Sequence, residues 1–399
     1  MNRAALTRLA TAAPRWGRVK WDELSKRPWD SLGGSVNQAC CTVSGGAFFR
    51  FVSLEKESDA TAVMIGTDTN RALDLLHIAQ CSQAISQHPN IFNISHASLE
   101  SIPCHMLQTT ASQSKVSTGD SSLNSNHTED RTESAVIMTD RVPITNVMSY
   151  VNHNKELHEY LPEKYEHSVA LLLLQLLNGL HHLQLHRVCL ASLKLEHLLL
   201  VDSSLPGGGS VLVINHIISH LQSDADESSP PSHDMYSTPL KLSEKIAEFN
   251  LGLLVYEFLH QPNPFAVITS LIAQSYEPKH LPAIPTRSKY SNGLTKLARG
   301  LLRKNPAERL TTNQAIGMLQ CLLWGPPADL MDDLDSQDQK LRRWLVTEQA
   351  RQVTNVSTYC IPGSGDSEGG FGLTDQLHCQ FLSDTSVQGL LENMMILCQ

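Results

Sequence analysis

The sequence lacks the charge pattern of a nucleic-acid-binding protein. Its 31 Lys and Arg residues are outnumbered by 40 Asp and Glu residues, which gives a formal net charge of -9 and a pI near 6.0. A surface that binds phosphates along a nucleic acid needs the opposite charge balance. We therefore expect no nucleic-acid partner.

The sequence is equally poor in cysteine pairs and in long hydrophobic runs. Its 9 cysteines are an odd number and form no C-x-x-C pair, so we expect neither a disulfide framework nor a zinc site, and a reducing compartment. His182 and His186 have a spacing that suits zinc, but no carboxylate or thiolate joins them at a fixed spacing. The longest apolar run, residues 169–177, includes Gln175 and is shorter than the roughly 20 residues that cross a bilayer. We expect no bound metal and no membrane span.

The first 32 residues form an unusual segment. Residues 1–20 carry Arg3, Arg8, Arg15 and Arg18 and no acidic residue, a pattern shared by mitochondrial transit peptides and by ordinary helices that lead into a fold. Three of the 5 tryptophans follow closely, at Trp16, Trp21 and Trp29. Such a density of tryptophan is typical of a segment that docks on another surface.

Hydrophobic patterning predicts an α+β fold with a strand-rich first part and a helical second part. We expect strands at residues 47–54, 61–65 and 134–139, and a hairpin that joins 198–201 to 211–214 through three glycines. We expect helices at residues 70–86, from near Ile144, at 163–186 and at 247–260, followed by more helices to the end. Residues 109–134 are almost wholly polar and are predicted to be a disordered loop.

Residues 190–200 resemble the catalytic loop of protein kinases. That loop reads H-R-D-L-K-x-x-N before an apolar strand; its Asp accepts the substrate proton and its Asn holds a magnesium ion. The framework residues 193–196 and the apolar run 198–201 are present here. Ser192 and His197, however, stand at the positions of the Asp and the Asn, so the loop is expected to fold without its chemistry.

The other phosphotransfer positions are also altered. The third strand of a kinase carries a lysine, and this chain has Met64 at that position. The helix that follows, residues 70–87, contains no glutamate to pair with a lysine, and the position expected for that glutamate lies near Ala79. Asn215 stands at the start of the D-F-G position, and no G-x-G-x-x-G occurs in the first hairpin. Loss of the general base alone costs roughly 10² to 10⁴ in rate. We therefore expect no catalytic, cofactor-binding or metal-binding residues. The alternative is a residual ATP-binding kinase that uses an atypical lysine, Lys56 or Lys194.

Four strings carry a closer resemblance, namely residues 171–176, 193–200, 256–265 (with H-Q-P-N-P-F) and 319–326 (with L-Q-C-L-L-W-G-P). With these strings the chain resembles the PEAK family of pseudokinase scaffolds. The resemblance implies a bilobal kinase-like fold in which the helices before and after it form a split helical dimerisation module. The implied boundaries are 1–32 for the leading helical segment, 33–143 for the small lobe with the disordered loop 109–134, 144–327 for the large lobe, and 328–399 for the trailing helical segment.

The resemblance also implies partners and a location. Family members form homodimers, or heterodimers with paralogous pseudokinases, and recruit signalling adaptors that act on the actin cytoskeleton, focal adhesions and cell migration. We therefore expect a catalytically inactive scaffold in the cytoplasm, at the actin cytoskeleton and focal adhesions. The dimer interface would use apolar residues of the two flanking segments: Trp16, Trp21, Trp29, Leu341, Trp344, Leu345, Phe381, Leu390 and Leu391.

Four further positions bear on structure and regulation. Ala247 stands where kinases have an aspartate in the large lobe, and Arg309 is retained although its usual glutamate partner is missing near Leu240. Residues 282–287 match P-x-x-P-x-R, a pattern shared by ligands of Src-homology 3 domains and by prolines that pack against a kinase helix. Tyr236 is a candidate phosphorylation site because it lies in a polar segment.

Overall fold

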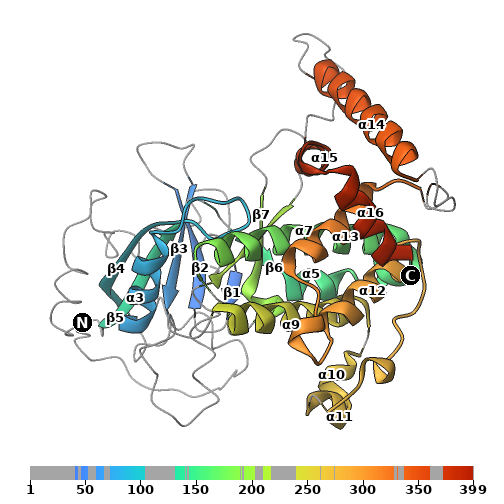
Figure 1. Ribbon diagram of the computed structural model, residues 1–399. Helices are drawn as coiled ribbons and strands as arrows, with labels where there is room; N and C mark the ends of the chain where they lie inside the picture. Colours follow the sequence, from blue (N-terminus) through green and yellow to red (C-terminus); the bar gives the residue numbers. More distant parts are fainter. Residues whose placement is uncertain are drawn as a thin grey trace. The chain divides into compact units, whose positions relative to one another are not determined.

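The computed structural model describes residues 41–43, 46–52, 60–66, 72–103, 131–139, 141, 143–188, 190, 193–202, 210–216, 240–260, 262–273, 275–327, 330, 337–359 and 372–398 (Figure 1). The chain divides into two compact units. The first consists of residues 1–147, 196–201 and 214–231, and the second of residues 148–195, 202–213 and 232–399. The leading segment with its three tryptophans, and the predicted phosphosite Tyr236, lie outside the described residues.

The first unit contains an antiparallel sheet covered by one helix. Strands β1 (Cys41–Val43), β2 (Gly46–Val52), β3 (Ala60–Gly66), β4 (Ile94–Pro103) and β5 (Arg131–Thr139) pair in the order β1-β2-β3-β5-β4. Helix α3 (Ala72–Ser82) contacts β4 and β5 and buries Ala72, Leu76 and Ala79, which share one helical face. The two predicted strands and the helix that follows them are confirmed.

Two local expectations in the first unit are wrong. Residues 131–134 belong to β5, because they pair with the edge strand β4 (Arg131 with Pro103, Ser134 with Glu100) instead of ending a loop; residues 104–130 are not described. Ile144 lies in strand β6 (Pro143–Asn146), and the helix α5 (Val147–His153) begins three residues later. Both strands depend on a partner distant in sequence, so local patterning does not reveal them.

A second sheet has the strand order β6-β7-β8, with β7 at Leu198–Asp202 and β8 at Ser210–Ile214. Thr145 of β6 pairs with Leu200 of β7 in an antiparallel register. Residues 198–201 and 211–214 are all buried, as expected for short continuous apolar runs. The predicted pair of strands is confirmed, and the glycine turn between them lies outside the described residues.

The second unit is helical and is built around α7 (Pro162–Leu185). It also contains α6 (Lys155–Tyr160), α9 (Leu240–Leu259), α10 (Pro264–Val267), α11 (Thr269–Ile272), α12 (Ser291–Leu301) and α13 (Thr312–Trp324), with short 3-10 turns at Leu195–His197, Pro278–His280 and Pro306–Glu308. Helix α7 contacts α6, α9 and α13. Gln175, the polar residue in its apolar run, is buried and accepts a hydrogen bond of 2.9 Å from the backbone N–H of Leu212. The predicted helices at 163–186 and 247–260 are confirmed.

Among the described helices, α7 is the one that is long and apolar enough to cross a membrane. Of its most apolar 18-residue stretch, 61% is buried inside the chain. Burial against α6, α9 and α13 explains its apolar composition as that of a core helix.

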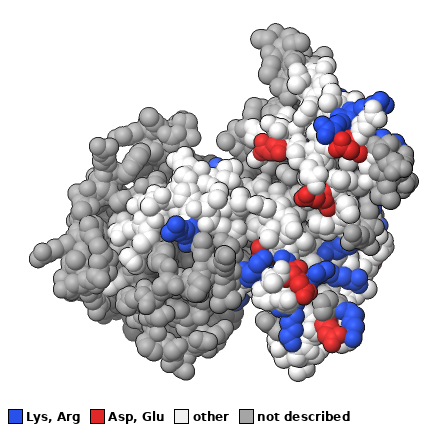
Figure 2. All heavy atoms as spheres, in the orientation of Figure 1, with Lys and Arg blue, Asp and Glu red and all other residues white. Residues whose placement is uncertain are grey.

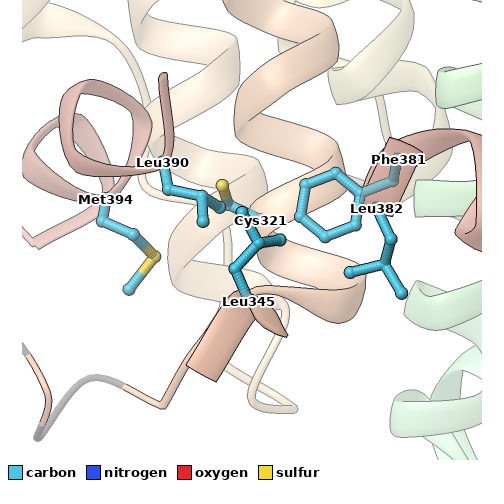
Figure 3. Close-up of a cluster of buried hydrophobic side chains, with 6 residues drawn as sticks. All are labelled: Cys321, Leu345, Phe381, Leu382, Leu390 and Met394. Atoms are coloured by element: carbon cyan, nitrogen blue, oxygen red, sulfur yellow. The ribbon is translucent and has the colours of Figure 1, made fainter. Parts of the chain in front are cut away.

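Three trailing helices complete the second unit: α14 (Gln337–Tyr359), α15 (Leu373–Asp384) and α16 (Val387–Cys398). All contribute to a cluster of buried side chains on α13, which contains Cys321, Leu345, Phe381, Leu382, Leu390 and Met394 (Figure 3). The rings of Trp324 and His378 stack beside it with centroids 5.2 Å apart. Figure 1 shows the far end of α14 extending beyond the helices on which it packs. The trailing segment is therefore a helical cluster with a core of its own.

Candidate functional site

The position of the missing lysine lies in the middle of the first sheet. Met64 on β3 pairs with Phe48 of β2 and with Ile137 of β5. A kinase places the phosphate-binding lysine on this strand, and a methionine offers neither charge nor hydrogen-bond donor. The partner position on α3, Ala79, is fully buried and equally apolar. The lysine–glutamate pair is thus replaced at both of its ends by apolar residues.

The two positions of the metal ligands come together as they do in a kinase. The backbone N–H of Asn215 donates a hydrogen bond of 3.0 Å to the carbonyl of His197. Residue 214 is held in turn by the segment before β4, because the N–H of Ile214 donates to Asn90 (2.9 Å) and its carbonyl accepts from Phe92 (3.2 Å). The backbone therefore brings residues 197 and 215 next to each other.

The side chains at these positions do not fit a magnesium nucleotide. His197 and Asn215 are both 0% exposed, and they supply an imidazole and an amide where a kinase has an amide and a carboxylate. Magnesium prefers oxygen ligands and keeps several waters, which two fully buried side chains do not accommodate. The nearby carboxylate of Glu196 lies 3.6 Å from the ring of His197. Over the described residues, no group of three or more His, Cys, Asp and Glu could hold a metal ion. We derive no phosphoryl-transfer step at this site.

The remaining positions of the loop are only partly described. Ser192, at the place of the catalytic base, and Lys56, one candidate replacement lysine, lie outside the described residues. Leu193 and Leu195 are buried and keep the apolar framework of the loop, whereas Lys194, the other candidate lysine, is exposed. The loop therefore retains the residues that fold it.

Sequence reasoning missed the partner of Arg309. Its usual glutamate is absent, but Glu248 of α9 is buried close by and attracts its positive charge. The guanidinium also donates two hydrogen bonds to the carbonyl of Arg303, of 3.1 and 3.0 Å, and one to the carbonyl of Lys245. An acidic residue next to Ala247 was the signal available in the sequence, although the same helix also contains Glu244 and Glu257.

Glu248 itself is held from two sides. One carboxylate oxygen lies 2.8 Å from the ammonium of Lys245, and the other accepts a hydrogen bond of 3.2 Å from the N–H of Thr312. Burial nevertheless raises the pKa of Glu248, although Lys245, Thr312 and Arg309 act in the opposite direction. The group ties the middle of α9 to the start of α13 and lies beside Arg309, whose usual glutamate partner is missing.

A second buried carboxylate, Glu166 on α7, organises the other end of the helical unit. It accepts hydrogen bonds from the hydroxyls of Ser288 (2.7 Å) and Ser291 (2.6 Å), and its second oxygen lies 3.5 Å from Nε2 of His158. Burial alone would raise the pKa of Glu166, but His158 and the two serines outweigh it and lower the pKa. The carboxylate therefore connects α6, α7 and α12 as an anion.

The P-x-x-P-x-R segment is packed in its first half. Ile284 is buried, and the carbonyl of Pro282 accepts a hydrogen bond of 2.6 Å from the hydroxyl of Tyr256. Pro285 and Arg287 are exposed. Residues 282–284 therefore contribute to packing, and the ligand interpretation of residues 282–287 stays a prediction.

The fold and the altered site together define a protein of the kinase class that has lost the residues of phosphotransfer, that is, a pseudokinase. The comparisons agree with this class. No family model matches the chain. The human inactive tyrosine-protein kinase PEAK1 is 34% identical over 282 residues, which cover 64% of this chain and 16% of the relative. The mouse inactive tyrosine-protein kinase PRAG1 is 27% identical over 426 residues, which cover 96% of this chain and 30% of the relative.

A solved structure supports the same placement over most of the chain. The crystal structure of the pseudokinase PEAK1 matches with a TM-score of 0.70 and 28% identity, covering 91% of this chain and 88% of the other. These similarities support the PEAK pseudokinases as the homologues of this chain. The chain spans less than a third of the curated relatives, 16% of PEAK1 and 30% of PRAG1, so the roles of those longer proteins are not transferred with the fold.

Proposed function

We propose that the chain is an inactive scaffold that dimerises through the helices flanking its kinase-like core and thereby assembles signalling adaptors. The observation that carries the proposal is the trailing helical cluster. Helices α14, α15 and α16 bury a set of apolar side chains of their own on α13, beyond the helices that build the kinase-like large lobe. An added helical layer with its own core is suited to present a surface to another chain.

The residues expected at the interface have to be reassigned. Leu341, Leu345, Phe381 and Leu390 are buried within the chain, and Trp344 packs against the same cluster, because the apolar faces of the trailing helices cover one another. The four buried residues shape the module and do not form its surface, whereas Trp344 is half-buried. Leu391 is half-buried. The contacts of Trp16, Trp21 and Trp29 stay a prediction, since these residues are not described.

The outer face of α14 is a better candidate for the contact with a second chain. Val346 is 64% exposed and Val353 is 68% exposed, and Ala350 lies between them, so the three residues follow an i, i+4, i+7 spacing on one face. Leu341 and Leu345, on the packed face, are buried. We propose that the face of Val346, Ala350 and Val353 contacts a second copy of the chain or a paralogous pseudokinase.

Adaptor recruitment and location are proposed from the family resemblance. We propose a cytoplasmic protein that acts at the actin cytoskeleton and focal adhesions in cell migration. Imaging of the tagged chain against focal-adhesion and mitochondrial markers tests this location. Mitochondrial accumulation would contradict it and would favour the transit-peptide interpretation of residues 1–20.

Light scattering coupled to size-exclusion chromatography tests dimerisation directly. At about 10 μM we expect the mass of a dimer, and Val346→Lys is expected to raise the dissociation constant at least about tenfold by placing a charge in the contact. The matched control is Val267→Lys on α10, where the valine is 61% exposed and lies outside the trailing helices. A wild-type monomer, or an equal effect of both variants, would contradict the proposal.

A further inference from the structure

Tyr160 is more exposed than the other tyrosine side chains that the structure describes. It is the last residue of α6 and is 76% exposed, and the next residue, Leu161, is also exposed. An aromatic side chain that covers no core in its own chain is available to an enzyme. We propose that Tyr160 is a phosphate-acceptor site for a protein tyrosine kinase that recognises acidic substrates. This inference does not depend on the proposed dimer.

Three other tyrosine hydroxyls of the second unit are engaged inside it. Each donates a hydrogen bond to a backbone carbonyl: Tyr165 to Phe258 (2.9 Å), Tyr256 to Pro282 (2.6 Å) and Tyr276 to Leu302 (3.3 Å). All three rings are buried. Burial also raises the pKa of Tyr256 and of Tyr276 to about 12. A kinase could reach these hydroxyls only after the unit unfolds.

The two remaining described side chains are also shielded. Tyr290 is buried beside the first turn of α12, with the ammonium of Lys289 5.1 Å from its ring centre. Tyr150 is half-buried, and burial raises its pKa although Ser168 acts in the opposite direction. Among the tyrosine side chains that the structure describes, Tyr160 is thus the accessible one.

The charge around Tyr160 is suited to recognition by a basic substrate groove. The charged residues nearest to it on α6 are the exposed Glu156 and Glu159, and Glu163 follows it and pairs with Lys289 at 3.2 Å. The exposed Lys155 and Lys164 lie farther along the chain, at the two ends of this stretch. Kinases select substrates in part by complementary charge around the acceptor. The acidic residues therefore favour a tyrosine kinase whose substrate groove is basic.

The end of α6 beyond His158, which is held by Glu166, is the part of this helix where local opening would begin. Helix α6 has 6 residues, well below the length at which an isolated helix is stable, and His158 is its buried residue. At its last turn the N–H of Leu161 donates a hydrogen bond of 2.8 Å to the carbonyl of Leu157. Leu161 already leaves the helical conformation, with φ -134 and ψ 60. Short local opening would present the extended chain that a kinase groove binds.

The reaction is transfer of the γ-phosphoryl group of ATP, supplied with the acting kinase. The bond from phosphorus to the leaving ADP oxygen breaks, and a new bond forms to Oη of Tyr160. The hydroxyl proton passes to the catalytic carboxylate of the acting kinase. The product carries about 1.5 to 2 negative charges near Glu156 and Glu159, and this repulsion favours the open form of the last turn.

Phosphorylation of the full chain in vitro tests the proposal. Tyr236 and Tyr359, whose side chains the structure does not describe, are first replaced by Phe. A soluble tyrosine kinase that prefers acidic peptides and MgATP are then added, and intact mass and peptide mass spectrometry give the number and position of phosphates. We expect about one phosphate per chain, on Tyr160.

Two variants in the same background separate the site from general reactivity. Tyr160→Phe should lower incorporation at least about tenfold, since it removes the acceptor oxygen and leaves the other described tyrosines in their buried places. Tyr290→Phe should leave incorporation unchanged. Phosphate found mainly on another tyrosine would overturn the proposal. An unphosphorylated chain, in a reaction where an acidic control peptide is phosphorylated, would also overturn it.

Discussion

Single residues explain why the kinase-like site lacks the groups for phosphotransfer. Met64 and Ala79 replace a charged pair by apolar side chains, and the buried His197 and Asn215 replace a hydrated metal site by an imidazole and an amide. A buried charge without a suitable partner is costly, so a site that has lost its metal is more stable without its carboxylate. The replacements are therefore consistent with each other as well as with loss of activity.

Restoring one carboxylate should harm the protein. We expect Asn215→Asp, the change toward the kinase motif, to lower the free energy of unfolding at neutral pH by roughly 1 to 3 kcal/mol because the new charge is buried. Urea denaturation measures the loss, which should shrink as pH falls and the carboxylate takes up a proton. Stabilisation of this variant by MgATP in a thermal-shift assay would contradict our interpretation of the site.

Glu166 makes a prediction about pH. Its pKa in the folded chain lies below the ordinary value of 4.5, so the folded chain binds its proton more weakly than the unfolded chain does. The stabilisation is therefore fully present above pH 4.5 and is lost as pH falls through the lowered pKa. Glu166→Gln should reduce stability at pH 7 and flatten this acid-side loss, as measured by urea denaturation at several pH values.

Glu248 provides the internal comparison for that prediction. The pKa of Glu248 is raised, and burial is the largest cause. The effect of Glu248 on stability therefore has the opposite sign: its contribution to the free energy of unfolding increases as pH falls through the raised pKa. Glu248→Gln should therefore not flatten the acid-side loss. The same flattening in both variants would mean that Glu166 is not the group responsible.

Helices and strands differ in how well the sequence predicts them. Helices α3 and α7 have apolar residues at helical spacing, and β7 is a continuous apolar run. Both patterns lie within the element itself, so the sequence predicts all three elements. Strand β6 and the first residues of β5 form only because β7 and β4 pair with them. Glu248 beside Arg309, and Glu166 beside Ser288 and Ser291, are contacts between distant segments. No local pattern contains that information.

The contact between α13 and α16 depends on a glycine. A Cβ atom at Gly317 would lie 2.3 Å from Nδ2 of Asn393, so the two helices approach closely there. We expect Gly317→Ala to push the terminal amide of Asn393 away from α13 and to lower stability by roughly 1 kcal/mol despite the better helix propensity of alanine. Chemical denaturation, with hydrogen exchange in residues 387–398, measures the effect.

Gly389 on α16 is the matched control. A Cβ atom there would meet the hydroxyl of Ser386 at 3.3 Å, a smaller conflict, so Gly389→Ala is expected to be neutral or stabilising by up to about 1 kcal/mol. Equal destabilisation by both variants would show that the trailing helices do not pack as described. The comparison thus tests the core of the trailing helical cluster without reference to dimerisation.

At the scale of the whole molecule, a kinase fold is kept and its chemistry is absent from the described site. Figure 2 shows basic and acidic side chains lying close together on the visible face, as expected of a surface with ion pairs such as Lys279–Glu277 and Arg342–Asp338. Sequence reasoning predicted the fold, the altered site and the added helices. It did not predict which side of the trailing helices is buried, because that depends on how α14, α15 and α16 pack on α13.

The central claim is that the chain acts through contacts of its flanking helices and not through a nucleotide site. Sedimentation equilibrium of the full chain, with and without about 1 mM MgATP, tests it most directly. We predict a dimer at micromolar concentration whose dissociation constant is the same in both conditions and is raised at least about tenfold by Val346→Lys. A monomer, or a dissociation constant that changes with MgATP, would contradict the account.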